Sequence, residues 1–306
     1  MSVREMETPR AEPARVSSLR VFSWLVRREF WEHRALWIAP LTVAVFAVAV
    51  HFLTALTISD ADRAAALADP TGRGPFMSLH AAVMGIVVVT GQLVGLLYAL
   101  DALQSERRDR SILFWKSLPV SDRATVLSKA FVVMVALPVL TVLLALAASM
   151  VAVSLQTIAW QLGGYAPARL WDRLDMGLLW FSLAYALPFM ILWNAPLYGW
   201  FLLASAWAKR VAFLWAAAPI AGLLIVEHTV LHKTGAHWLV ERRIAGGILE
   251  SFTIPAPHGG EIVWVRSLAE LDPLRLWTLP GLWIGVGVAA AFLWAAIRLR
   301  HSRPPL

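Results

Sequence analysis

Several residue types and motifs are scarce or absent in this chain, and each absence excludes a class of protein. The 306 residues include no cysteine, which excludes a disulfide framework and thiolate metal sites. Only 15% of them are charged and 59% are hydrophobic, whereas soluble domains average about 25% charged residues. Neither a G-x-x-x-x-G-K-[ST] loop nor a G-x-G-x-x-G loop occurs. We therefore expect an all-α integral membrane protein that does not itself bind ATP.

Long apolar runs define the expected membrane spans. About 20 apolar residues cross a hydrocarbon core of about 30 Å, and residues 35–59 contain no Asp, Glu, Lys or Arg. Prolines inside several runs predict kinks, which a membrane bundle tolerates when neighbouring helices satisfy the backbone. Pro188 and Pro196 are expected to break the fourth run around Asn194. A single six-span domain over residues 35–298 follows, with spans at about 36–57, 79–100, 130–155, 176–203, 211–231 and 276–297.

The segments outside the spans are expected to be short. Residues 1–18 have no periodicity and are expected to be disordered, while residues 19–34 predict an amphipathic interfacial helix. Residues 299–306 form a short cytoplasmic tail. Between spans five and six, apolar side chains recur at helical spacing and predict a short external helix. These side chains are Leu239, Val240, Ile244, Ile248, Leu249 and Phe252.

The positive charges are distributed unevenly along the chain. Of the 27 Lys and Arg residues, 18 lie on segments assigned to the inner side, which places both termini in the cytoplasm by the positive-inside rule. This bias also explains the formal net charge of +7 without nucleic acid, since no basic soluble module is visible. The expected surroundings are membrane lipid.

A polar segment at residues 106–129 separates spans two and three. Within it an apolar group, Ile112 to Trp115, lies between basic residues in a loop too short to form its own core. One Trp or Phe buries roughly 150 to 250 Å², which contributes a few kcal/mol at about 25 cal/mol per Å². This group therefore needs a surface to pack against. From the residues alone, a partner protein and the lipid headgroups are equally good candidates.

The same segment resembles the first cytoplasmic loop of type-II ABC exporter permeases. The matching positions are Glu106, Ser111, Ile112, Leu113, Leu118, Pro119, Val120, Ser121 and Lys129, whereas Arg110 and Ser128 stand where members commonly have Gly. Residues 27–34, RREFWEHR, also resemble the amphipathic helix that precedes the first span in that family.

The resemblance implies a non-catalytic permease subunit of the bacterial inner membrane that pairs with a second copy or a paralogue. A cytosolic ABC ATPase dimer would carry ATP and Mg²⁺ and would dock on a coupling helix in this loop. The residues implied to dock are Glu106, Arg107, Arg108, Arg110, Ser111, Ile112, Leu113, Phe114, Trp115 and Lys116. Lipids, peptides and amphipathic drugs all remain possible cargo.

Other polar residues leave alternatives open. Gln92 and Asn194 lie deep in predicted spans, where they would serve interhelical hydrogen bonding or a transport pathway. A membrane-embedded enzyme is the alternative function, with an external site that uses His228, His232, His237 and His258. The order around His228 is not the H-E-x-x-H of zinc proteases, which favours simple polar capping of a span. A non-transporting anchor or sensor is a third possibility.

Overall fold

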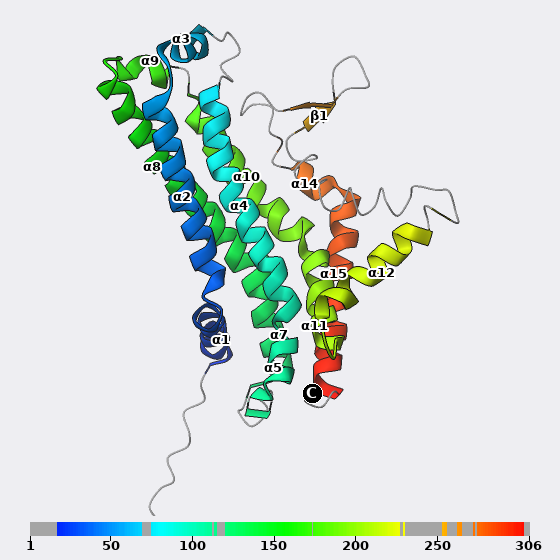
Figure 1. Ribbon diagram of the computed structural model, residues 1–306. Coiled ribbons are helices and arrows are strands. Elements are labelled where there is room, and N and C mark those ends of the chain that lie inside the picture. Colours follow the sequence, from blue (N-terminus) through cyan, green and yellow to red (C-terminus); the bar gives the residue numbers. More distant parts are fainter. Residues whose placement is uncertain are drawn as a thin grey trace, which may run out of the picture.

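The computed structural model describes residues 17–68, 75–111, 113–114, 120–172, 174–226, 229, 253–255, 262–264, 272 and 274–302. These residues form helices joined by short turns, with one short pair of strands (Figure 1). Five helical segments within them are long and apolar enough to cross a membrane: Ala35–Thr57, Phe76–Arg108, Asp122–Leu162, Met176–Trp193 and Pro280–Ser302. The prediction of an all-α membrane protein is confirmed at this level.

The segments between the long helices gather at two opposite ends of the bundle. Helices α3 (Asp60–Ala68) and α9 (Pro167–Trp171) lie at one end, while α1 (Ser18–Glu32), α5 (Gln104–Arg108) and the C-terminus lie at the other (Figure 1). Segments expected on the same side of the membrane therefore share an end. We refer to the end with α1 and α5 as the α5 end.

The third membrane segment is one continuous helix of three parts. Helix α7 (Asp122–Phe131) is capped by Ser121, whose side chain accepts from the Ala124 N–H. A π-helical turn, η1 (Val132–Ala136), joins it to α8 (Leu137–Leu162). Pro138 has no N–H to donate to the preceding turn, and this irregular turn accommodates that defect.

The break expected around Asn194 in the fourth apolar run, residues 176–203, is present in the structure. Helix α10 (Met176–Trp193) ends before Asn194, and α11 (Ala195–Trp207) begins directly after it. Pro196 lies in the first turn of α11, where its missing N–H costs nothing, and the Leu197 N–H donates to the Asn194 carbonyl oxygen over 3.0 Å. The fourth run thus consists of two short helices that meet at Asn194.

The six-span layout is not established by the structure. Helix α12 (Ala212–Val226), at the predicted fifth span, has 15 residues and is about 22 Å long, shorter than the hydrocarbon core. Residues 1–16 and the apolar stripe predicted for the external helix lie outside the described residues. In the external segment, strands β1 (Thr253–Pro255) and β2 (Ile262–Trp264) pair antiparallel, with Thr253 opposite Trp264. Helix α14 (Arg275–Thr278) then leads to α15 (Pro280–Ser302), which extends into the predicted tail.

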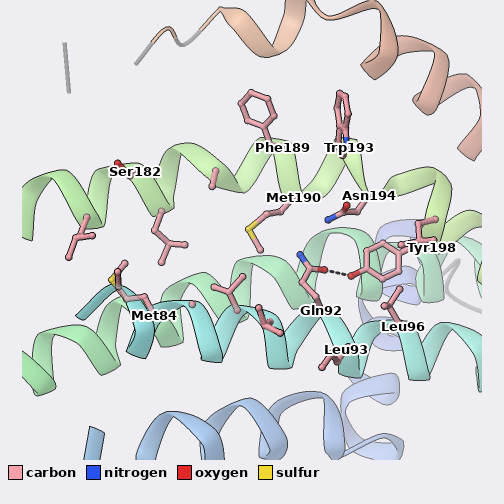
Figure 2. Close-up of a pocket in the computed structure, with 18 residues that line it drawn as sticks. Met84, Gln92, Leu93, Leu96, Ser182, Phe189, Met190, Trp193, Asn194 and Tyr198 are labelled. Atoms are coloured by element: carbon pink, nitrogen blue, oxygen red, sulfur yellow. Dashed lines mark hydrogen bonds between the residues drawn. The ribbon is translucent and has the colours of Figure 1, made fainter. Parts of the chain in front are cut away.

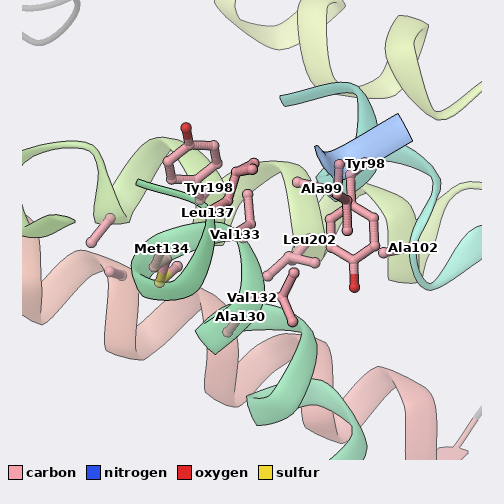
Figure 3. Packing of buried hydrophobic residues seen from close by; sticks show 13 residues of the cluster. Tyr98, Ala99, Ala102, Ala130, Val132, Val133, Met134, Leu137, Tyr198 and Leu202 are labelled. Carbon is pink, nitrogen blue, oxygen red and sulfur yellow. The ribbon is translucent and has the colours of Figure 1, made fainter. Parts of the chain in front are cut away.

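The central core lies where α2 (Ala35–Thr57), α4 (Pro75–Asp101), η1, α8, α11 and α15 meet. Its buried side chains include Tyr98, Val133, Tyr198 and Leu202 (Figure 3). Glycine allows the close approach of α4 to α8, because a Cβ at Gly91 would lie 2.1 Å from Thr141 Cγ2. In membranes the hydrophobic effect does not drive helices together. Close packing through small residues at helix contacts is therefore a usual means of association.

Substitution of Gly91 by alanine is expected to destabilise the bundle by about 1 to 3 kcal/mol, because the added methyl group overpacks the α4 to α8 contact. Thermal unfolding of the purified protein in detergent would measure the effect. Gly85→Ala on the same helix is the matched control, since its Cβ would meet nothing within 4 Å. Equal stability of the two variants would contradict this packing.

Candidate functional site

The residues expected to form the coupling segment fall into two groups at the α5 end. Glu106 and Arg107 are buried, whereas Arg108 and Arg110 are exposed. Leu113 and Phe114 are 55% and 59% exposed. Ser111 is half-buried, and Ile112, Trp115 and Lys116 lie outside the described residues. Among the described residues, the surface of this segment therefore consists of Arg108, Asp109 and Arg110 beside two apolar side chains.

Helix α5 is held by hydrogen bonds to the C-terminal end of α11. The Ser205 hydroxyl oxygen accepts from the backbone N–H groups of Leu103 and Gln104 over 3.0 and 2.9 Å, which satisfies donors at the start of α5. The Arg107 guanidinium donates to the carbonyl oxygens of Ala206 and Ala208 at the end of α11, at 2.9 and 3.3 Å. Arg107 thus holds the base of the loop and does not lie on its surface.

A buried ion-pair cluster lies directly beneath α5. We define it as Glu29 of α1, Glu106 of α5, Lys129 of α7 and Arg300 of α15. Lys129 Nζ lies 2.9 Å from both Glu29 carboxylate oxygens and 3.1 Å from Glu106 Oε1. Arg300 Nη1 lies 2.5 Å from Glu106 Oε2. The cluster therefore joins four helices that are distant in the sequence.

Further polar groups surround the cluster. The Tyr98 hydroxyl donates to Glu29 over 2.8 Å, and Arg300 Nε contacts Asp122 at 3.1 Å. Arg28 donates to Glu32 through Nε at 2.7 Å. Burial lowers the pKa of Arg28, but the hydrogen bond with Glu32 and the nearby carboxylates outweigh burial, so its pKa lies above the ordinary value. Arg28 is thus a fixed positive charge at the edge of the cluster.

Gln92 and Asn194 face the same cavity in the membrane. The cavity has a volume of about 460 Å³ and lies between α4 and the pair α10 and α11. Gln92, Met190 and Asn194 point toward one another across it (Figure 2). The Tyr198 hydroxyl donates to Gln92 Oε1. The interhelical role considered for Gln92 is therefore present, and both amides also line the cavity.

A second buried polar group, toward the end of the bundle opposite the α5 end, was not identified from the sequence. The Nε2 atoms of His51 and His80 lie 3.3 and 2.6 Å from Gln156 Oε1, and all three side chains are buried. Neither Nδ1 atom has a hydrogen-bond partner among the described residues. A histidine inside an otherwise uncharged span is a recognised signal of a polar site, and His51 is one in residues 35–59. This triad ties α2, α4 and α8 together.

Among the described residues, one cluster has donor atoms close enough together to hold a metal ion, but one of its carboxylates already has partners. Glu29, Glu32 and His33 have oxygen or nitrogen atoms within 4.8 Å of one another. Glu29 is bound by Lys129 and Tyr98, so a cation there would have to displace an existing ammonium. The histidines of the alternative enzyme site, His228, His232, His237 and His258, lie outside the described residues.

Removing the lysine of the ion-pair cluster is expected to destabilise the protein strongly. Lys129→Met leaves two buried carboxylates without their shared cation, which costs about 3 to 5 kcal/mol. Thermal unfolding in detergent would show a large fall in midpoint, and adding Glu29→Gln should recover part of it. The exposed Lys209→Met is the control. No recovery in the double variant would mean that Lys129 does not act through Glu29.

The histidine triad makes a separate prediction. Gln156→Leu leaves two buried imidazole N–H groups without an acceptor, each of which costs about 1 to 3 kcal/mol. The measurement is again the unfolding midpoint. Ser154→Ala on the exposed face of α8 is the control, because its hydroxyl donates only to the Met150 carbonyl of its own helix. A Gln156→Leu protein as stable as this control would show that the triad is not hydrogen-bonded in this way.

Comparison with known proteins does not identify a family for this arrangement. No family model matches the chain, no curated protein matches it and no solved structure matches it. Its function must therefore be argued from its own contacts: an exposed apolar and basic segment, the ion-pair cluster beneath it and a cavity at membrane depth.

Proposed function

We propose that this chain is the membrane-spanning subunit of an ATP-driven exporter of the type-II ABC class. A separate cytosolic ATPase dimer would supply ATP hydrolysis, with Mg²⁺, and a second permease copy or a paralogue would complete the substrate path. The chain itself would be non-catalytic and would reside in the bacterial inner membrane with both termini in the cytoplasm.

The observation that carries the proposal is the surface of the coupling segment. Leu113 and Phe114 are more than half exposed, at the end of the bundle where α1, α5 and the C-terminus gather. Exposed Arg108 and Arg110 lie beside them. Apolar anchors flanked by cations fit a partner with an apolar pocket and an acidic rim, where charge sets orientation and burial supplies most of the affinity.

The connections of α5 supply a route from this surface to the membrane helices. A load applied to the coupling segment passes through Glu106 to Lys129 and Arg300, and through Arg107 to the end of α11. Ion pairs and hydrogen bonds in a buried, dry environment resist separation more than exposed ones do. A motor that displaced this segment would therefore shift α7, α11 and α15 together.

The resemblance to type-II permeases gains support from two local features. Two of the matching positions, Glu106 and Lys129, contact each other at 3.1 Å although 23 positions separate them. Arg110, where members commonly have Gly, adopts a φ of 57°. That left-handed conformation costs a non-glycine residue roughly 1 to 2 kcal/mol, so the backbone here has the shape that favours glycine.

The proposal predicts that an ATPase binds through Leu113 and Phe114. Each side chain, if fully buried, contributes about 1.5 to 3 kcal/mol, so Leu113→Ala combined with Phe114→Ala should weaken association about 100-fold or more. The measurement is recovery of a cytosolic ABC ATPase with the tagged permease from its native membrane, together with ATP hydrolysis by the complex.

A matched control is Leu162→Ala, which removes an equally apolar side chain, 73% exposed, at the opposite end of the bundle. Its ATPase recovery should equal that of the unaltered protein. If the double variant retains full ATPase association while the protein remains folded, the docking role is refuted. If no ATPase copurifies with the unaltered protein, the exporter proposal itself fails.

A further inference from the structure

The cavity between α4 and α10 is an elongated groove. Its α4 side runs from Ala81 to Leu96, which corresponds to about 22 Å of helix and most of the thickness of a hydrocarbon core. Its volume of about 460 Å³ lies within the usual range of small-molecule sites. Val89 and Leu93 of this lining are more than half exposed, so the groove opens at the side of the bundle.

The lining of the groove is apolar with one polar region. Among the described residues, no Asp, Glu, Lys, Arg or His lines it. Gln92, Asn194 and Tyr198 gather near one end, and the rest of the lining is almost entirely aliphatic, aromatic or Met. An ion placed here would find no opposite charge, and burial of an unpaired ion is costly. The groove therefore favours uncharged molecules.

The polar region has hydrogen-bond donors to spare. Gln92 Oε1 is occupied by the Tyr198 hydroxyl, so the Gln92 carboxamide presents its N–H groups. The Asn194 side-chain amide makes no hydrogen bond with the described part of the chain, and it points toward Gln92 (Figure 2). Donors without acceptors at membrane depth are costly, because lipid tails cannot satisfy them. An acceptor oxygen between these two amides would satisfy both.

We propose that this groove binds an uncharged, elongated amphipathic molecule. Its hydroxyl or carbonyl oxygen accepts hydrogen bonds from Gln92 and Asn194, and its apolar body lies along α4 and α10. This assignment rests on the proposed export function, for which it specifies the substrate class: neutral amphiphiles and not ionised ones.

Photolabelling of the purified full-length permease, without ATPase, tests the proposal. The probe is a long-chain fatty alcohol with a diazirine group, and the corresponding fatty acid at pH 8 is its ionised counterpart. The alcohol should label peptides of α4 and α10 saturably, and the acid should label them much less. Gln92→Leu and Asn194→Leu should each raise the half-saturating alcohol concentration about 3- to 10-fold, the effect of one lost hydrogen bond.

Two further variants make the result specific. Thr90→Val is the matched control on α4, because the Thr90 hydroxyl donates to Ile86 of its own helix and does not line the groove. Met190→Trp fills the groove from α10 without altering either amide, and should abolish saturable labelling while the unfolding midpoint is kept. This second route tests the groove even if Asn194→Leu, at the helix break, fails to fold.

Several outcomes would overturn the proposal. One is labelling that is unchanged in the Gln92→Leu and Met190→Trp proteins, and another is equal labelling by alcohol and acid. A third is a disulfide between two Leu93→Cys copies that blocks labelling, which would show that a second copy covers the groove. Because these measurements use the permease alone, they are independent of the ATPase pull-down. Saturable labelling, together with no ATPase recovered from the native membrane, would refute the export function and leave the groove assignment standing.

Discussion

The arrangement of the α5 end depends on one buried ammonium group. Lys129 lies against two carboxylates, Glu29 and Glu106. Glu29 belongs to α1, before the first span, and Glu106 belongs to α5, after the second. Each of these charges alone would be expensive to remove from water, and only their mutual contact makes burial tolerable. Charge neutralisation at Lys129 thereby links α1 to α5 and α7.

One buried polar group connects the helices at the α5 end and another connects them toward the opposite end, and their chemistry differs. His51, His80 and Gln156 are held by hydrogen bonds to one carboxamide oxygen, whereas the ion-pair cluster is held by formal charges. Neutral groups are the cheaper solution among helices that face lipid, and charges are tolerated close to the aqueous boundary. The difference agrees with a bundle whose α5 end carries most of the positive charge.

The sequence predicted the apolar helices well because their signal is local. A run without Asp, Glu, Lys or Arg identifies a span from its own residues, and Ser121 followed by Asp122 identifies a helix start. A break around Asn194 was expected from Pro188 and Pro196, but two prolines in an apolar run do not reveal which of them interrupts the helix. Only the structure shows that Pro188 stays inside α10 while Pro196 begins α11.

Long-range partners were beyond the reach of sequence reasoning. Lys129 and Glu29 are 100 positions apart, and nothing near either residue specifies the other. Arg107 looked like part of a basic surface because three arginines are close in the sequence, yet the helical turn of α5 directs it toward the α11 carbonyls. The pairing of His51 with His80 depends likewise on how α2 and α4 pack.

The division of the fourth membrane segment at Asn194 separates two sets of attachments. Helix α10 packs against α8, and α11 packs chiefly against α15 and α4. Asn194 joins these rods and also faces the groove. A change in the angle between α10 and α11 therefore alters the width of the groove beside this residue. Bending of the segment at Asn194 and the shape of the groove are thus coupled.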